Sequence, residues 1–553
     1  MRPILLSFFM LLIFVSAASA TAPVALALHV GDGLYEDLDH FRTLGLWTGG
    51  LELRPISRAE FDRALRSIEA SAEGAALGEG DLRRLRRLRA ASEAWNLRSR
   101  PSECRARRDG FAPSRWEPFA TLQFLGGPTD LDDRIDLNRR PRRDGAFILG
   151  LDAGLGRSLA AGWRWYEDYS ALSAHPEDGW VDNLPPDLRG TFTDPRSRND
   201  RAVLAWGRGA MDLRLGREDR RWGQGRRGTL FLSENSFPLD GLSFRFRSRW
   251  ISGASLIAQS WRAPNPPGTG EETSEAQRLG DGYFAAHRFE LHPRESWSLG
   301  IYEAVAWGGR GLDLAYANPL GFFVAMTQDI WDRAAADDKK VIGVDFRVRM
   351  APLSFYGEWL VNRIVTLDAA EDGDEAGITS MAQLAGVSWA NPFGLSGADL
   401  QIEYAHLDPE VYFHPDGDSR RSLLSEGELI GHWAGPNSDD LHLAFRFPEM
   451  RAGLFRLEFE QVRWGLIEGM KGAEFGFLGL TKAEKKWIVG EIFSERSFAL
   501  FWEKRGWKTP LAGELDSILS LARIEQGGTG SDSGWQAELR LAWRWSAVFR
   551  DPS

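Results

Sequence analysis

An alternation of apolar and polar residues runs through most of this chain and limits what it can fold into. It is longest near the C-terminal end, where Trp535, Ala537, Leu539, Leu541, Trp543, Trp545, Ala547 and Phe549 form the apolar set. Because neighbouring side chains of a β-strand point to opposite faces, a period of two predicts strands with one apolar face. Shorter runs recur from about Trp116 onward, for example at Ile342 to Val348 and at Leu441 to Phe447.

The predicted strands are joined by short turns and long polar segments. The short turns are Ala351-Pro352, Gly207-Arg208-Gly209 and His292 to Glu295, and the long segments are 126–144, 262–285, 362–380, 406–440 and 505–533. Short connections at one end and long ones at the other are typical of β-barrels in an outer membrane. The region after residue 110, at about 25 residues per strand and connection, gives roughly 16–20 strands.

Composition favours a β-barrel over a helical membrane protein. The net charge is −11, and no later segment approaches the ~18 consecutive apolar residues of a membrane helix. The 23 tryptophans favour a membrane protein, because indole rings collect at membrane interfaces. The alternative is a secreted propeller or sandwich, which would also alternate but would not need such long, aromatic apolar rows.

The first residues are predicted to be an export signal. Arg2 precedes the apolar run Ile4 to Val15, and Ala18-Ser19-Ala20 offers the small residues that a signal peptidase needs, so we expect cleavage after Ala20. The alternative, a membrane-anchoring helix, would need a longer run. The single cysteine, Cys104, cannot form an internal disulfide and is interpreted as incidental.

Residues 33 to 97 show helical spacing instead. Leu34, Leu38 and Phe41 share one face before Gly45, a plausible helix stop, and Ser57 to Glu60 fits a capping box. A third helix places Leu82, Leu85 and Leu88 on a face between Arg83, Arg84, Arg86, Arg87 and Arg89. We interpret these arginines as a solvated face rather than as a site for nucleic acid or lipid head groups. The domains predicted are a signal peptide (1–20), a periplasmic helical domain (21–110) and a barrel (111–553).

Several collinear segments resemble the capsule assembly Wzi family of outer-membrane proteins. They are Tyr35 to Leu38, Leu44 to Leu46 and Arg54 to Arg58; Gly216 to Gly228 with Leu232 to Asn235; Glu303 to Val305 with Tyr316 to Leu320; and Tyr404 to His414 with Gly435 to Leu441. The resemblance covers most of the mature chain. One departure is that the chain continues past Phe549, whereas barrel proteins usually end on the aromatic residue.

The resemblance implies a mainly β fold: a large antiparallel transmembrane β-barrel of about 18 strands with a small N-terminal α-helical bundle. It also implies a role in binding, attaching or organising capsular polysaccharide at the surface of a Gram-negative cell. Composition and spacing do not show that role.

The segment from Gly216 to Gly228 carries five arginines among glycines, namely Arg217, Arg220, Arg221, Arg226 and Arg227. Guanidinium groups could grip the carboxylates of an acidic glycan or lipid phosphates. Because charges in a filled lumen need partners, we favour the alternative that they pair with carboxylates of neighbouring strands. The segment is not a P-loop, since no Gly-Lys-Ser/Thr follows it.

Other candidate residues are weaker. Trp180 and Trp433 lie in predicted loops and could stack on sugar rings, or could equally anchor the protein at the membrane interface. Inward Arg245, Arg247 and Arg249 could form an anion-selective ladder, although a fully paired interior is as plausible. His406, His414 and His432 with Asp408 and Asp416 match no metal motif, so no metal is expected. Ser233 beside Glu234 gives no catalytic arrangement, so no catalytic residue is assigned.

The sequence thus predicts a non-enzymatic barrel without a cofactor. Its expected partners are surface or capsular polysaccharide, outer-membrane lipids and lipopolysaccharide, and the barrel assembly machinery, and no nucleic acid. The alternative function is a porin-like channel for small solutes or anions, which an open lumen would distinguish. A surface hydrolase is a third class, which the sequence does not favour.

Overall fold

The computed structural model describes residues 33–97 and most of the chain from 113 to 546. Outside the described part lie residues 1–32, 98–112, 127–146, 156–157, 169–195, 209, 237, 262–281, 320, 322, 324–337, 366–376, 410, 415–420, 426–427, 467–487, 509–513, 528–531 and 547–553. The predicted signal peptide, Cys104, Asp416 and Trp180 therefore lie outside the described residues.

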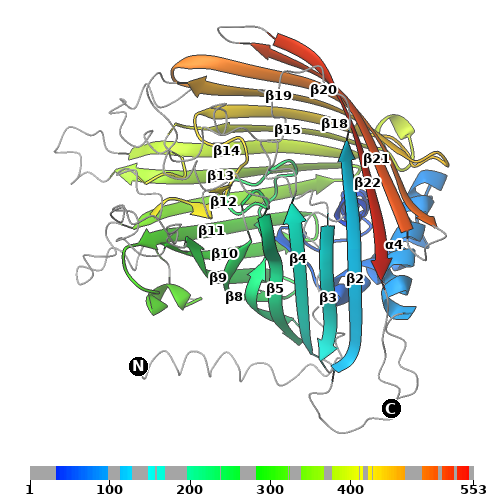
Figure 1. Ribbon diagram of the computed structural model, residues 1–553, viewed down its shortest axis with the longest axis horizontal. Coiled ribbons are helices and arrows are strands. Elements are labelled where there is room, and N and C mark those ends of the chain that lie inside the picture. The colour runs from blue at the N-terminus through cyan, green and yellow to red at the C-terminus, as the bar shows by residue number, and fades with distance from the viewer. Residues whose placement is uncertain are drawn as a thin grey trace.

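The described strands close into one antiparallel barrel (Figure 1). In chain order they are β2 (Pro113–Gly126), β3 (Phe147–Leu155), β4 (Leu159–Asp168), β5 (Arg196–Arg208), β6 (Met211–Glu218), β8 (Leu239–Arg247), β9 (Ile251–Trp261), β10 (Gly282–Arg294), β11 (Trp297–Gly308), β12 (Lys339–Met350), β13 (Leu353–Val365), β14 (Gly377–Ala390), β15 (Asp399–Leu407), β18 (Ser438–Arg446), β19 (Leu454–Leu466), β20 (Glu491–Lys508), β21 (Glu514–Gly527) and β22 (Asp532–Ser546). Each pairs with the next, and β22 returns to β2, with Ser546 opposite Phe119. The prediction of a large antiparallel barrel is confirmed, with eighteen strands in the described residues.

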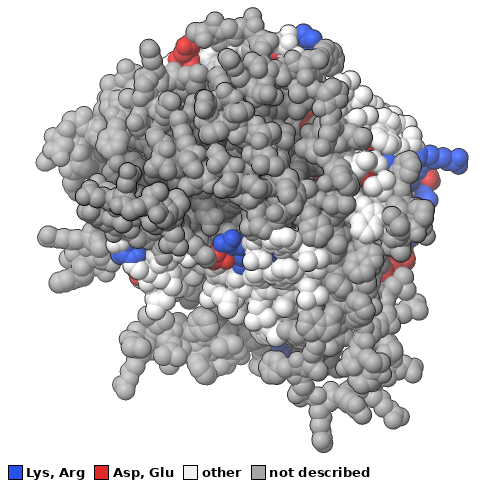
Figure 2. Space-filling model, viewed as in Figure 1, with Lys and Arg blue, Asp and Glu red and all other residues white. Residues whose placement is uncertain are grey.

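The alternation separates the outside of the wall from its inside. On β11, Leu299 and Ile301 are 51% and 42% exposed, whereas Tyr302 and Ala304 are buried in the lumen. The first pair faces outward, where lipid lies, and the second faces the lumen. Figure 2 shows that most of the described surface on one side of the molecule is uncharged.

The two ends of the barrel differ. At one end the strands are joined by short turns such as 295–296 and 351–352, and at the other by segments such as 309–338 and 408–437. The predicted turn at Ala351-Pro352 is confirmed. The turn predicted from His292 lies later, because β10 continues to Arg294 with a register shift after Leu291. Pro293 lies in that irregular stretch, where it has no N–H to donate to a ladder.

Three helices cover the short-turn end: α2 (Leu34–Thr43), α3 (Arg58–Ala72) and α4 (Glu79–Leu97) (Figure 1). Ser57 caps α3, and Glu60 completes the predicted capping box. Leu85 and Leu88 are buried in the core of these helices, whereas Leu82 is 40% exposed. None of the described helices is long and apolar enough to cross a membrane.

The solvated arginine face predicted for α4 is wrong at Arg84, which is buried. Arg84 and Arg87 are three residues apart and therefore share a face of the helix, and that face meets Asp37 of α2. By contrast, Arg83, Arg86 and Arg89 remain on the solvent side, where their partners are exposed or half-buried glutamates.

Two insertions of the chain pack inside the lumen against the inward side of β8 to β15. Residues 219–236, hereafter the inner segment, enter it between β6 and β8. Their strand β7 (Arg221–Trp222) pairs with β1 (Leu53–Arg54) of the N-terminal region. A second insertion between β15 and β18 carries the hairpin of β16 (Leu424–Ser425) and β17 (Glu428–Leu429). Both insertions and the inward side of the wall share one apolar core, so hydrophobic burial holds them in place.

Candidate functional site

The Gly- and Arg-rich motif forms a tight turn inside the lumen. Gly223 has φ +146°, a conformation that side chains other than glycine rarely adopt. A Cβ on Gly225 would lie 1.8 Å from the carbonyl oxygen of Gly228. The glycines therefore allow the backbone to fold closely on itself and to present its N–H groups to the wall.

A carboxylate of the wall receives three of these N–H groups. Glu358 on β13 accepts hydrogen bonds from the backbone N–H of Gln224 (2.5 Å) and Gly225 (2.7 Å) through Oε1. Its Oε2 accepts the N–H of Leu230 (2.7 Å). Successive backbone N–H groups in a turn make an anion-binding concavity. In this protein its anion is the side chain of Glu358.

Glu403 on β15 has the same role beside it. It accepts the backbone N–H of Arg226 (2.5 Å) and of Arg227 (2.8 Å), and Tyr356 donates its hydroxyl hydrogen to it at 2.8 Å. The motif is therefore an anion nest whose two anions belong to the barrel wall.

All five candidate arginines have partners within the protein. Arg217 pairs with Asp240 (2.5 Å), Arg220 donates to the carbonyl oxygens of Glu218 (3.1 Å) and Leu239 (3.0 Å), Arg221 pairs with Glu234 (2.6 Å), Arg226 pairs with Asp39, and Arg227 pairs with Glu460 (2.5 Å). Arg217 and Arg227 thus pair with carboxylates of the wall, as expected of an internal network, whereas Arg221 and Arg226 pair with carboxylates of the inner segment and of α2, and Arg220 bonds to carbonyl oxygens. Whether any of the five also binds a glycan stays a prediction.

Arg226 connects the inner segment to the helical region. Its partner Asp39 lies on α2 and also pairs with Arg42 (3.1 Å) and Arg347 (3.6 Å). Burial alone would raise the pKa of Asp39, but the three guanidinium groups lower it to about 2. Asp39 therefore remains ionised, which a buried carboxylate among three cations requires.

Arg227 and Trp433 form the centre of a second group of side chains. The guanidinium carbon of Arg227 lies 5.1 Å from the centroid of the half-buried Trp433 ring. His432 and Asp440 lie beside them, with His432 Nε2 and Asp440 Oδ2 3.9 Å apart. Burial, and then Arg227 and Arg221, lower the pKa of His432 to about 3, so this ring is neutral. We call Arg227, His432, Trp433, Asp440 and Glu460 the Trp433 cluster.

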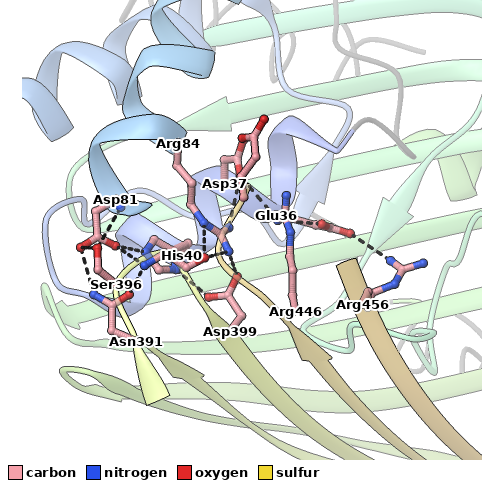
Figure 3. Close-up of polar contacts among 12 residues, drawn as sticks. Glu36, Asp37, His40, Asp81, Arg84, Asn391, Ser396, Asp399, Arg446 and Arg456 are labelled. Atoms are coloured by element: carbon pink, nitrogen blue, oxygen red, sulfur yellow. Dashed lines mark hydrogen bonds and ion pairs between the residues drawn. The ribbon is translucent and has the colours of Figure 1, made fainter. Parts of the chain in front are cut away.

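A third polar group joins the helices to the short-turn end of the wall (Figure 3). Asp37 pairs with Arg87 (2.5 Å), Arg84 (3.2 Å) and Arg446 of β18 (3.5 Å). Burial would raise its pKa, but these guanidinium groups, Arg87 first, lower it to about 2. Nearby, His40 faces a carboxylate oxygen with each ring nitrogen, Asp399 at 2.6 Å and Asp81 at 2.9 Å.

The arginine ladder considered for β8 is replaced by pairing. Arg245 donates to the carbonyl oxygens of Leu53 and Pro55, and Arg247 lies 3.4 Å from Glu60. Arg249 has a 74% exposed side chain beyond the strand. Of the two hypotheses, an anion-selective ladder and a paired interior, the structure agrees with the paired interior.

A half-open cavity enclosing about 250 Å³, part of it open to solvent, lies between the residues that follow α2 and the turn joining β10 to β11. Arg42, Glu52 and Arg347 line it. It lies at the helical end and shares no lining residue with the Trp433 cluster.

A family described as "Capsule assembly protein Wzi" matches residues 139–446, which is more than half of the chain. The chain belongs to the capsule assembly protein Wzi family. The matched range contains the inner segment, Trp180 and Trp433, and it ends at the last residue of β18.

One solved structure supports the same fold, and two others are similar at a lower level. Wzi of Escherichia coli, described as an outer-membrane protein involved in group 1 capsule assembly and as a carbohydrate-binding β-barrel, has a TM-score of 0.57 at 14% identity, over 94% of this chain and 99% of that one. OprD of Pseudomonas aeruginosa reaches 0.42 at 12% identity (81% and 98%), and OccAB2 of Acinetobacter baumannii 0.40 at 12% (79% and 100%). A search of curated proteins found no match. Like other members of the Wzi family, this protein is a β-barrel of the Gram-negative outer membrane.

The sequence reasoning missed Glu358 and Glu403, the two residues that hold the motif. Alternation places both on the inward side of their strands, because they share the parity of Tyr356 and Ala405. That signal finds inward residues, but it does not say which of them meets the inner segment.

Proposed function

We propose that this protein binds surface or capsular polysaccharide and helps to anchor or assemble it at the cell surface, without catalysing a reaction. The observation that carries the proposal is the family match over residues 139–446. The fold of a protein described as a carbohydrate-binding barrel supports it. The two insertions packed against the inward side of β8 to β15 also support binding over transport, because they occupy interior space that an open channel would need.

The binding surface proposed is the end opposite the helices. Long connections of outer-membrane barrels face the outside of the cell, and here they include 169–195, 262–281 and 408–437. Trp180 lies in the first of these and Trp433 in the last, so both are candidate platforms for a sugar ring.

Within the described residues, the Trp433 cluster is the best candidate contact. Stacking on an aromatic face and hydrogen bonds to hydroxyl groups are the two interactions that recognise sugars. Trp433 offers the ring, and Glu460, whose side chain is 17% exposed, offers oxygen acceptors close to it, whereas Asp440 is buried beneath them. Arg227 could contact an acidic sugar while it is held by Glu460. We assign Arg220, Arg221 and Arg226 an indirect role, in which they hold the inner segment beneath this surface, and Arg217 the role of joining β6 to β8 where that segment begins and ends.

The first test is deletion of the gene, with tagged protein expressed from a plasmid as the complementing control. Surface-retained and released polysaccharide are measured, and the tagged protein is followed by membrane fractionation. A shift of polysaccharide from cells to medium, reversed by the plasmid, supports the proposal. Unchanged surface polysaccharide with the protein present in the outer membrane contradicts it.

The second test concerns the site. Trp433→Ala should weaken binding of the purified protein to the host polysaccharide by at least fivefold in a surface-based binding assay. Trp297→Ala is the matched control, because Trp297 is 52% exposed at the helical end of β11. Equal affinity of the two variants would show that Trp433 is not part of the binding site. It would not contradict the proposed binding of polysaccharide by the protein.

Other partners follow from the location. The barrel contacts outer-membrane lipids and lipopolysaccharide and is inserted by the barrel assembly machinery after export. We propose no nucleic-acid partner, because a net charge of −11 disfavours binding to a polyanion. The intact protein in a planar bilayer should show no conductance, and steady conductance would favour the channel alternative.

A further inference from the structure

The outward face of β9 to β11 carries a patch that does not meet lipid directly. Outward positions in the lower half of β11 are exposed, as Leu299 and Ile301 are, but Val305 and Trp307 on the same face are fully buried. They belong to a small apolar cluster separate from the lumen core. Something on the outside of the barrel therefore covers this half of the wall.

The covered patch contains a polar pair. Glu303 of β11 stands opposite His287 of β10 in the ladder, and both have the outward parity. They are 4% and 1% exposed, with His287 Nδ1 3.5 Å from Glu303 Oε1. Ionisable side chains that face lipid are costly and are rarely left bare. This pair explains why the wall needs a cover here.

The cover consists of the described residues of the connection that follows β11, namely 309–319, 321 and 323, which we call the flap. Its 3-10 helix η3 (Leu314–Ala317) lies beside β9, and the ring of Tyr316 packs against Trp307 at 4.8 Å. Phe323 stacks on His287 with ring centroids 4.1 Å apart, and its backbone N–H donates to Glu303 at 2.9 Å.

The start of the flap, next to β11, is also fixed. Arg310 pairs with Asp338 at 2.6 Å, and the hydroxyl of Tyr316 donates to Asp338 at 2.6 Å. Ring packing and hydrogen bonds thus hold the flap at both ends against the outside of the barrel.

The depth of the patch follows from strand geometry. At about 3.3 Å per residue and a tilt of roughly 40°, the stretch from Trp297 to Trp307 rises about 25 Å. That is about the height of the apolar band of an outer-membrane barrel. Glu303 therefore lies about 10 Å below Trp307, within the band and on the side away from the helices.

The exposed residues of the flap include two leucines as well as Asn318. Leu312 is 50% and Leu314 is 70% exposed. On the wall beside the covered patch, Leu242 of β8 stands opposite the covered Ile257 of β9 and is 41% exposed on the outward face. We propose that the flap is inserted laterally into the outer leaflet, where Leu312 and Leu314 contact lipid acyl chains while the flap shields the His287–Glu303 pair. This proposal does not rest on polysaccharide binding.

The test places an environment-sensitive label on the flap of the full chain. Leu314→Cys in a Cys104→Ser background is labelled with bimane, and the protein is reconstituted into phosphatidylcholine vesicles with or without bromine on the acyl chains. We expect the bromolipid to quench the label at least twofold and aqueous iodide to quench it little. Glu491→Cys, at an exposed position on the same end of the barrel, is the control and should show the opposite pattern.

A second variant tests what holds the flap. Phe323→Ala removes the ring that covers His287, so iodide quenching of the label on Leu314→Cys should rise at least twofold. The proposal would be overturned if, in the protein that keeps Phe323, aqueous iodide quenches the label on Leu314→Cys and the bromolipid does not. If Phe323→Ala does not fold, the first experiment still decides it, and neither readout depends on retention of polysaccharide.

Discussion

Replacing Glu358 by alanine removes the acceptor of three buried backbone N–H groups, those of Gln224, Gly225 and Leu230. A buried donor left without a partner costs about 1–3 kcal/mol, so the three together cost about 3–9 kcal/mol. Water that enters beside the shortened side chain can satisfy some of them, which favours the lower end. We therefore expect the inner segment to open more easily by about 3 kcal/mol, which is roughly a hundredfold in the opening equilibrium.

Hydrogen exchange read by mass spectrometry measures this opening directly. Amides around Gln224 should exchange about a hundredfold faster in Glu358→Ala than in the parent protein. Glu358→Gln keeps one oxygen and should lose mainly the bond to Leu230, which gives an effect of about 1–3 kcal/mol. Glu525→Ala, at a wall carboxylate on β21 whose side chain is 45% exposed, is the matched control and should leave this exchange unchanged.

Two results would refute the reasoning about Glu358. If exchange around Gln224 is unchanged in Glu358→Ala, the wall carboxylate does not hold the inner segment. If Glu358→Gln is as damaging as Glu358→Ala, the effect comes from loss of charge and not from the number of N–H groups satisfied.

Three further predictions concern the helices and the motif. Asp37 and Asp39 have pKa values lowered to about 2 from 3.8, so the stability they add is present above about pH 4 and is lost as the pH falls towards 2; proteolysis of residues 34–97 should accelerate in that window, and less so in Asp37→Asn. Gly225→Ala would bring a Cβ within 1.8 Å of a carbonyl oxygen and should reduce the yield of folded barrel on a heat-modifiability gel, whereas Gly74→Ala, with nothing within 4 Å, should not. Ser57→Ala removes the acceptor that caps α3 and should lower the local stability of that helix by about 1 kcal/mol, seen as faster amide exchange there and nowhere in the wall.

Local periodicity determined much of this fold in advance. The alternation at Leu441 and His442 assigned one to the outside and the other to the lumen, and the structure has them 36% exposed and buried. The capping box at Ser57 and Glu60 was predictable for a similar reason, since it involves four consecutive residues. Both features depend on neighbours in the chain, so no knowledge of the rest of the fold is needed.

Local periodicity could not predict which side chains pair across long distances in the sequence. Gln224 and Glu358 are 134 positions apart, and Arg84 and Asp399 are 315 apart. Many inward carboxylates and arginines have the right parity and charge, and Coulomb attraction at this range does not discriminate among them. The solvated face predicted for α4 failed at Arg84 for that reason.

The sequence by itself therefore determined a membrane barrel with inward and outward faces, a helical N-terminal region and an arginine-rich motif in need of anions. Only the tertiary structure decided that Asp39, Glu234, Asp240 and Glu460 are the anions that pair with those arginines. It also decided that Glu358 and Glu403 accept the backbone N–H groups of the motif, and that a connection after β11 folds back over the outside of the wall. Both depend on which strands become neighbours when β22 closes onto β2, because closure fixes the distances across the lumen and along the wall.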